Sequence, residues 1–260
     1  MRIGWRYACL SVILCFAVGC TTVPGEKIGG MTVDLAFPDA RVAKLVSAVT
    51  AGDYADADEQ IKAGADVNYV GTDGISPLIW VMYEGHRARD YRGVEFLLKA
   101  GANPNYVVKG GTSEGSSVMY FAAGGDSPEL LKLLLEHKGN PNLVGVGGPL
   151  LHVAVMERRR KNIDLLFKYG ADVNVIYGDE DVAATACALG DFELSAYFLQ
   201  RGLNADLEDL AECVHTRRVP PHSEAQRWKD KVIGMLRERG IKYPPPDFNA
   251  PPPTLHIWGR

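Results

Sequence analysis

Gly64-Ala65-Asp66-Val67-Asn68 is the first of five similar phrases in this chain of 260 residues. The other four are Gly101-Ala102-Asn103-Pro104-Asn105, Lys138-Gly139-Asn140-Pro141-Asn142, Gly170-Ala171-Asp172-Val173-Asn174 and Gly202-Leu203-Asn204-Ala205-Asp206. Their closing residues lie 37, 37, 32 and 32 positions apart. A period of roughly 33 residues predicts one small unit stacked repeatedly, because each unit must cover its apolar face with a neighbour.

Helix signals surround each phrase. In the clearest copy, Ser76 before Pro77 is a typical helix start, since the hydroxyl caps the first turn and proline fits its backbone angles. A second apolar segment, 94–98, ends at Gly101, and glycine accepts the left-handed conformation that stops a helix. We expect the amide of Asn68 and its counterparts to satisfy backbone groups in the turn that follows. Each unit is therefore predicted to be a helix-turn-helix.

This register resembles the ankyrin repeat, in which T-P-L-H opens the first helix and G-A-x-x-N follows the second. The resemblance covers residues 40–243 and implies an all-α solenoid of stacked helix-turn-helix units with short β-hairpin loops. The predicted boundaries are an N-terminal cap at 38–68, repeats at 69–105, 106–142, 143–174 and 175–206, and a C-terminal cap at 207–243. Two insertions are expected, one at Arg87 to Tyr91 and one in the long hairpin from Asn105 to Ser117.

The N-terminus reads as an export signal. Arg2 and Arg6 precede an apolar run from Ala8 to Val18 that is short for a membrane span. The run ends in 17–20, Ala-Val-Gly-Cys, which resembles the lipobox of bacterial lipoproteins. That resemblance implies a signal peptide at 1–19, lipid on Cys20, and a place at the outer membrane facing the periplasm. An uncleaved anchor and ordinary signal cleavage remain alternatives. Residues 20–37 are predicted to be a flexible tether, and 244–260 a proline-rich tail.

No catalytic motif stands out, so the sequence predicts a protein that is not an enzyme. There is no P-loop and no zinc-ligand spacing, and we expect neither a cofactor nor a metal. His86 and His152 fall at repeat positions where the ankyrin resemblance implies structural hydrogen bonding. The acidic cluster 53–59 is interpreted as a solvated cap surface. The formal net charge of −4 argues against nucleic acid as a partner.

Two features have open interpretations. The basic run from Glu157 to Lys161 is either a solvated turn between two helices or a contact for an acidic protein patch or lipid headgroups. Cys187 and Cys213 would both remain after signal removal. Cys187 is either a buried thiol or, because first helices of adjacent repeats lie close in an oxidising periplasm, half of a disulfide with Cys213.

By resemblance to ankyrin proteins, a protein partner is expected on the concave surface formed by hairpin tips and first helices. The residues that map there are Thr72, Asp73, Ile75, Tyr83, Glu84, Ser113, Glu114, Ser116, Met156, Glu157, Tyr177, Glu180 and Leu189. Trp80 and Tyr120 lie beside this set and are expected to be partly core. Aromatic and acidic residues on a rigid face suit a basic protein partner.

Three classes of function follow. The first is a periplasmic immunity protein that neutralises a secreted effector, since lipoproteins and ankyrin proteins both occur among the immunity proteins of type VI lipase or phospholipase effectors. The second is a general envelope scaffold or stress-protection partner. The third, a lipid-anchored enzyme, has no catalytic constellation to support it.

Overall fold

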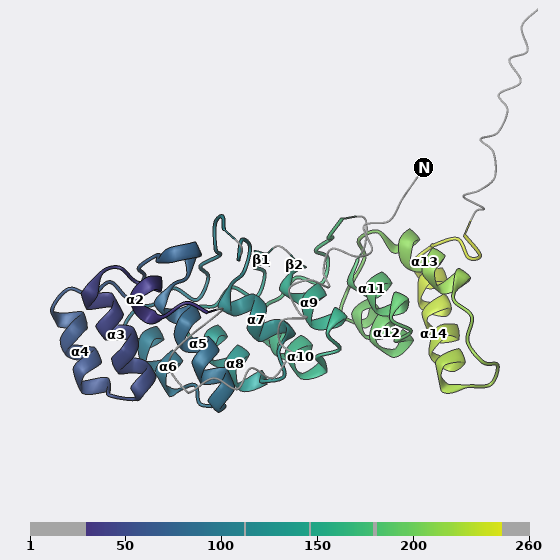
Figure 1. Ribbon diagram of the computed structural model, residues 1–260. Coiled ribbons are helices and arrows are strands. Elements are labelled where there is room, and N and C mark those ends of the chain that lie inside the picture. Colours follow the sequence, from purple (N-terminus) through teal and green to yellow (C-terminus); the bar gives the residue numbers. More distant parts are fainter. Residues whose placement is uncertain (1–29, 112, 146, 179–180, 246–260) are drawn as a thin grey trace, which may run out of the picture. The chain divides into compact units, whose positions relative to one another are not determined.

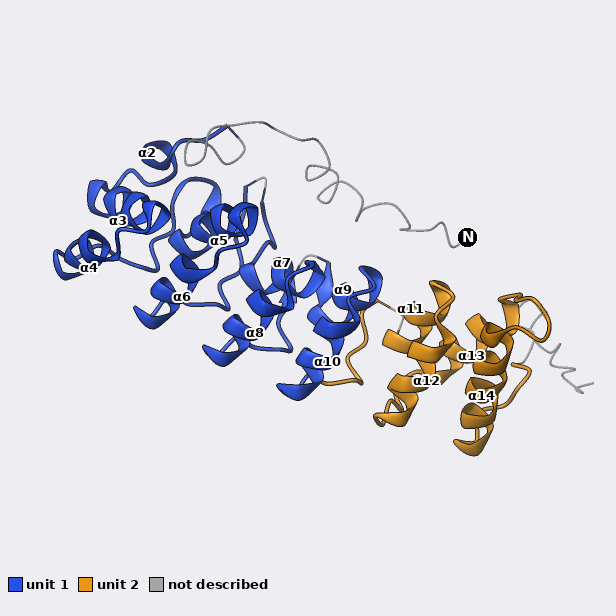
Figure 2. Ribbon diagram, turned by 90° about the horizontal axis from the view of Figure 1, so that it is seen from below, with its two compact units in different colours: residues 1–171 blue, residues 172–260 orange. Residues whose placement is uncertain are grey.

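The computed structural model describes residues 30–111, 113–145, 147–178 and 181–245 (Figure 1). The chain divides into two compact units, Met1–Ala171 and Asp172–Arg260 (Figure 2). The predicted signal peptide, Cys20 and the tail beyond residue 245 lie outside the described residues. Among the residues that are described, no helix is both long and apolar enough to cross a bilayer.

Unit 1 consists of helix pairs connected by short hairpins. Helices α3, α5, α7 and α9 form one row, here called the inner helices, and α4, α6, α8 and α10 form a second row of outer helices (Figure 2). The elements are α2 (Val33–Ala36), α3 (Ala40–Ala51), α4 (Tyr54–Lys62), η2 (Thr72–Gly74), α5 (Pro77–Ala88), α6 (Arg92–Lys99), α7 (Val118–Gly124), α8 (Pro128–Glu136), β1 (Val144–Gly145), β2 (Gly148–Pro149), α9 (Leu150–Met156) and α10 (Arg160–Lys168). The predicted all-α repeat fold is confirmed.

The inner helices carry most of the core. Ser76 accepts a hydrogen bond from the amide of Ile79 at 3.3 Å and begins α5 as predicted, and Ser117 does the same for α7. Trp80 in α5 is completely buried, so it is core throughout, whereas the expectation was partial burial. Burying such a large apolar side chain between neighbouring repeats is what makes the units mutually dependent.

The recurring asparagines join one repeat to the next. Asn68 donates from Nδ2 to the carbonyl of Gly101 at 3.0 Å and accepts from the amide of Asn103 at 2.7 Å. Asn105 makes the same two bonds to the following phrase, at 2.9 and 2.6 Å. The sequence predicts that each amide satisfies backbone groups in the turn that follows it. It lies instead between two successive loops, because stacking brings equivalent loops within hydrogen-bonding distance.

The third phrase exchanges its first two residues. Lys138 has a φ of 68° at the position where Gly101 has 94° in the preceding phrase. Gly139 then takes the place of the alanine, and a Cβ there would lie 2.7 Å from the carbonyl oxygen of Leu134. A lysine in the left-handed conformation costs on the order of 1 kcal/mol relative to glycine. This copy of the loop is therefore locally strained.

Both predicted insertions are present, and they differ in structure. The first lengthens α5 to 12 residues, against seven in α7 and α9. The second enlarges the loop before α7, where Val108 donates to the carbonyl of Ser116 and accepts from the amide of Gly115, each at 2.9 Å. We call the loops before the inner helices finger A (69–76), finger B (106–117) and finger C (143–149). In finger C, β1 and β2 pair antiparallel.

The folded part of unit 1 begins earlier than residue 38. Residues 33–36, assigned to the flexible tether, form α2, and Phe37 is 1% exposed. The Phe37 ring packs edge-on against Trp80, with 5.8 Å between centroids, and Thr72 Oγ1 donates to the carbonyl of Leu35 at 2.7 Å. The predicted tether boundary is wrong at this end, because these residues cover the open side of the first repeat.

Unit 2 contains α11 (Val182–Ala188), α12 (Phe192–Gln200), α13 (Leu207–Thr216) and α14 (Glu224–Glu238). The last two are the helices expected in the C-terminal cap. Cys187 in α11 and Cys213 in α13 form a disulfide, with their Cα atoms 6.3 Å apart. Of the two interpretations of Cys187, the structure therefore supports the disulfide, which joins two inner helices within this unit.

Candidate binding surface

The three fingers of unit 1 form a continuous row. Tyr106 of finger B donates from its hydroxyl to the carbonyl of Gly74 in finger A at 3.0 Å. A Cβ on Gly145 of finger C would lie 3.0 Å from the carbonyl oxygen of Gly115 in finger B. Because adjacent fingers touch, their exposed side chains belong to one rigid surface, which we call the finger face.

Most of the predicted partner-binding residues reach solvent. Exposed side chains belong to Thr72, Asp73, Glu114 and Met156 in unit 1 and to Tyr177 in unit 2. Partly buried side chains belong to Tyr83, Glu84, Ser113, Ser116 and Glu157 in unit 1 and to Leu189 in unit 2. Ile75 is 8% exposed and belongs to the core, which corrects its assignment. Glu180 lies outside the described residues.

The finger face includes aliphatic residues that the sequence prediction missed. Val70 is 54% exposed and Val144 is 55% exposed. Each stands two residues after a loop asparagine, and Val107 and Ile176 hold the same register position. This recurrence of β-branched residues was visible in the sequence, and it would have identified the position, because a solvated loop gives no reason to repeat an apolar side chain.

Aromatic rings connect α5 with α7. Phe121 receives the edge of Tyr83 at 5.6 Å and of His86 at 4.8 Å between centroids. Burial raises the pKa of the Tyr83 hydroxyl and lowers the pKa of His86, so both groups are neutral near pH 7. His86 is a structural residue, as predicted, and Tyr83 contributes to packing as well as to the surface.

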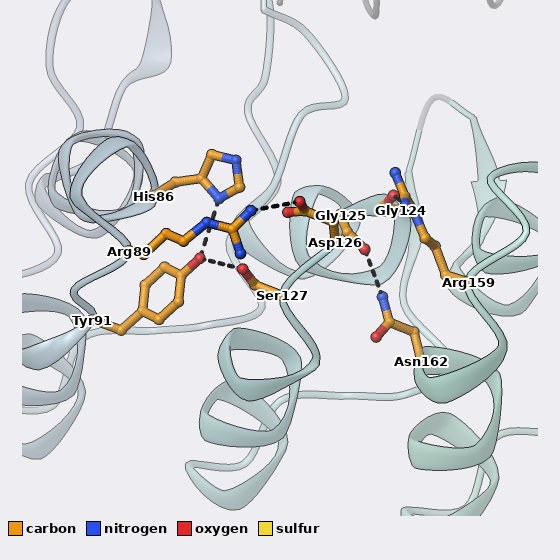
Figure 3. A network of polar contacts seen from close by, with 9 residues as sticks. All are labelled: His86, Arg89, Tyr91, Gly124, Gly125, Asp126, Ser127, Arg159 and Asn162. Atoms are coloured by element: carbon orange, nitrogen blue, oxygen red, sulfur yellow. Dashed lines mark hydrogen bonds and ion pairs between the residues drawn. The ribbon is translucent and has the colours of Figure 1, made fainter.

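Three joints connect successive repeats of unit 1. A joint is the place where the end of one inner helix meets the next inner helix and the start of that repeat's outer helix. In the second joint, between α5 and α7, Tyr91 donates to Ser127 Oγ at 2.8 Å and Arg89 pairs with Asp126 at 2.9 Å (Figure 3). His86 Nδ1 lies 3.1 Å from the Tyr91 hydroxyl. Polar side chains therefore close this joint.

In the third joint, between α7 and α9, two side chains cover the end of α7 (Figure 3). Asn162, which is 1% exposed, donates from Nδ2 to the carbonyls of Ala122, Ala123 and Gly125 at 3.1, 2.9 and 3.0 Å. Arg159 donates from Nε to the carbonyl of Gly124 at 2.8 Å. The arginine run was left open between a solvated turn and a partner contact, and its Arg159 instead holds two repeats together.

The first joint, between α3 and α5, contains a cavity of about 660 Å³. Its walls come from the last turn of α3, the second half of α5 and the start of α6. They include Val49, Thr50, Ala51, Val81, Glu84 and Gly93. A volume of this size lies within the range of small-ligand sites.

Glu84 is the acidic residue of the cavity wall that has the least satisfied carboxylate. Only 11% of its side-chain surface is exposed, and Oε1 is buried without a hydrogen-bond donor. The guanidinium of Arg87 is 3.7 Å away, which is an ion-pair distance but too long for a hydrogen bond. By contrast, the carboxylate of Asp90 accepts from Arg92 at 2.6 to 3.0 Å.

The comparisons with known proteins agree with this architecture. Residues 86–177 match the family model of ankyrin repeats, in three copies. No curated protein is similar enough to the chain to count as a match. Within the described residues, no group of three His, Cys, Asp or Glu side chains is arranged to hold a metal ion. Ankyrin repeats indicate a protein–protein interaction module, and proteins built from them are generally non-catalytic binding scaffolds.

Proposed function

We propose that this chain is a non-catalytic lipoprotein that binds a protein partner through the finger face of unit 1. Lipid on Cys20 would hold it in the cell envelope, at the outer membrane and facing the periplasm. The observation that carries the proposal is the finger face itself, a rigid row of touching loops on which Val70 and Val144 are more than half exposed. Exposed aliphatic side chains on a rigid support favour a protein interface.

Charge indicates the kind of partner. Two exposed acids, Asp73 and Glu114, and one exposed base, Lys109, lie in fingers A and B. The excess of acidic groups favours association with a basic surface, mainly by raising the rate of encounter. A basic protein patch is therefore the expected counterpart of the finger face.

The disulfide supports the proposed compartment. Cys187 and Cys213 are bonded, and such bonds persist in the oxidising periplasm but are rare in a reducing cytosol. This agrees with the export signal and the Ala17-Val18-Gly19-Cys20 motif in the sequence. Replacing Cys20 by Ser should release the protein from isolated membranes into the soluble periplasmic fraction, whereas continued retention would indicate an uncleaved anchor.

The most specific form of the proposal is immunity. A tethered protein with exposed aliphatic side chains on its finger face could occlude a lipase or phospholipase effector delivered by type VI secretion, at the membrane where that effector acts. Affinity capture from the envelope of cells challenged with such an effector should retain it at a one-to-one ratio. Capture of an assortment of resident envelope proteins would favour the alternative, a general interaction scaffold.

Paired variants test whether the finger face is the interface. Val70→Asp combined with Val144→Asp should weaken capture at least about tenfold, since each change places a charge in an apolar contact. Ala55→Asp puts one such charge on the exposed surface of outer helix α4 and should leave capture unchanged. Equal capture by both proteins would show that the partner binds elsewhere.

A further inference from the structure

The first and third joints have the same place in the repeat but different residues. We set the register by the glycines that follow the outer helices, Gly101 with a φ of 94° and Gly170 with a φ of 90°. Counting back from these glycines, Asp90 corresponds to Arg159, the residue whose Nε bonds the end of α7. Gly93 corresponds to Asn162. The first joint therefore lacks both side chains that close the third.

The helix end in the first joint also matches the one in the third. Thr50 and Ala51 in α3 correspond to Gly124 and Gly125, whose carbonyls accept from Arg159 and Asn162 in the third joint. Both Thr50 and Ala51 line the cavity. Carbonyls in the last turn of a helix have no backbone donor within it and carry the negative end of the helix dipole. The residues that carry these carbonyls thus belong to the cavity wall.

Glu84 adds a formal negative charge to these acceptors. Its Oε1 is buried without a hydrogen-bond donor, and the rest of its side chain faces little solvent. A buried carboxylate oxygen without a donor is costly, and a cationic donor relieves that cost. Val49 and Val81 line the same cavity and offer an apolar surface to an alkyl chain.

From these observations we propose that the first joint binds an arginine side chain of the protein partner. The guanidinium would take the place that Arg159 has in the third joint, pair with Glu84 and donate to the end of α3. Its stem would lie against Val49 and Val81. The proposal rests on the proposed function, because it names one group that the partner must supply.

Arginine is favoured over lysine by the geometry of the acceptors. A guanidinium presents five N–H donors in a planar fork, so it can serve a carboxylate and a helix end together. A lysine ammonium is a compact, strongly hydrated charge that loses more when it enters a partly enclosed cavity. In the third joint, Arg159 of the chain itself already donates to the end of a helix in this way.

The test is a titration of the chain carrying Cys20→Ser with N-acetyl-arginine amide, followed by backbone amide chemical shifts. Shifts should appear at the end of α3 and in the second half of α5 and saturate at roughly millimolar concentration, as expected for a single side chain. N-acetyl-citrulline amide has nearly the same shape without the charge and should give no saturable shifts there. Equal effects of the two compounds would overturn the proposal.

Two variants and one matched control locate the site. Glu84→Gln should weaken binding of N-acetyl-arginine amide about tenfold, by removing the charge-assisted bond. Glu157→Gln changes the register counterpart of Glu84 in the third joint, which Arg159 already closes, and should leave binding unchanged. Ser47→Leu fills space from an exposed position of α3 that lines the cavity, keeps the carboxylate, and should abolish the shifts.

The outcomes separate this proposal from the proposed function. Shifts confined to the fingers, shifts insensitive to both Glu84→Gln and Ser47→Leu, or saturable binding of N-acetyl-aspartate amide in place of the arginine compound would each overturn the arginine site. A partner captured through the finger face with equal affinity by wild type and Glu84→Gln would overturn the arginine site alone. Failure of the Val70 and Val144 variants to weaken capture would overturn the finger face instead.

Discussion

The first and third joints of unit 1 hold the same place in the repeat, but side chains close the third and a cavity lies in the first. In the third, Asn162 and Arg159 give donors to four carbonyls at the end of α7, and the space is filled. In the first, Gly93 and Asp90 stand at those positions, and a cavity of about 660 Å³ remains. The two joints therefore differ in the residues at two equivalent positions and in whether a cavity remains.

The comparison teaches that repeat register assigns function better than residue type does. Arg159 stands in a run of three arginines and attracts attention as a surface charge, yet it holds two repeats together. Gly93 attracts none, yet a Cβ there would lie 2.9 Å from Val81 and 3.0 Å from Val49, so the position accepts no side chain without movement. Glycine at this position allows α6 to lie close to Val49 of α3 and Val81 of α5.

The largest effect is expected in unit 2, where a covalent bond joins two inner helices. Replacing Cys187 and Cys213 by alanine removes the crosslink across 26 residues and should lower the free energy of unfolding of this unit by about 3 kcal/mol. Urea unfolding under non-reducing conditions measures the loss. If the double variant unfolds at the same midpoint as wild type, the α11–α13 contact is held by packing alone.

Asn162→Ala should have the second largest effect on stability. It removes three buried hydrogen bonds and leaves a void in the third joint, so a loss of about 2–3 kcal/mol is expected by equilibrium unfolding. Asn162→Leu copies Leu130, which holds the same register position in the second joint, and should lose less because it keeps the volume. A larger loss for leucine than for alanine would contradict the expectation that the volume of the side chain contributes to the stability of this joint.

Asp181 makes the stability of unit 2 depend on pH. Burial raises its pKa from 3.8 to about 7 in the folded state, with Asp206 and Asp209 adding to the shift. The contribution of Asp181 to the stability of unit 2 is therefore fully present below about pH 4, and it is lost as the pH rises through 7. The free energy of unfolding of unit 2 should rise by on the order of 2 kcal/mol when the pH falls from 8 to 5. Asp181→Asn should flatten that profile, and an unchanged slope would show that other groups cause it.

The smallest effect is expected at Lys138. Its φ of 68° suits glycine, which stands at this position in the other four phrases. Lys138→Gly should raise the free energy of unfolding by up to about 1 kcal/mol, measured by thermal or urea unfolding. A matched change, Lys132→Gly in the interior of α8, should instead destabilise by about 1 kcal/mol. If Lys138→Gly does not raise the free energy of unfolding, the loop is not strained.

The sequence predicts the repeats well because their spacing repeats. The helix pairs, the caps formed by Ser76 and Ser117, and both insertions follow from register and local chemistry. The disulfide stayed open in the sequence, because pairing depends on distances that spacing alone does not set. Ile75 was misplaced for a similar reason, since side-chain direction at the end of a finger depends on how neighbouring fingers pack.

The cavity could not be predicted from any single repeat. Its wall includes Glu84, Arg87 and Ala88 of the longer α5. The insertion was evident in the sequence, but its consequence appears only when the first joint is compared with the third. The periodic Val70 and Val144 are also visible in the sequence, and only their exposure shows that they form part of a surface.

A crystal structure of the chain grown with N-acetyl-arginine amide tests the central claim most directly. The account predicts a guanidinium in the first joint, against Glu84 and the end of α3, while the third joint keeps Arg159 on Gly124 without additional density. A first joint closed by the chain's own side chains, with the compound absent or bound elsewhere, would contradict the claim that this joint is the open counterpart of the third.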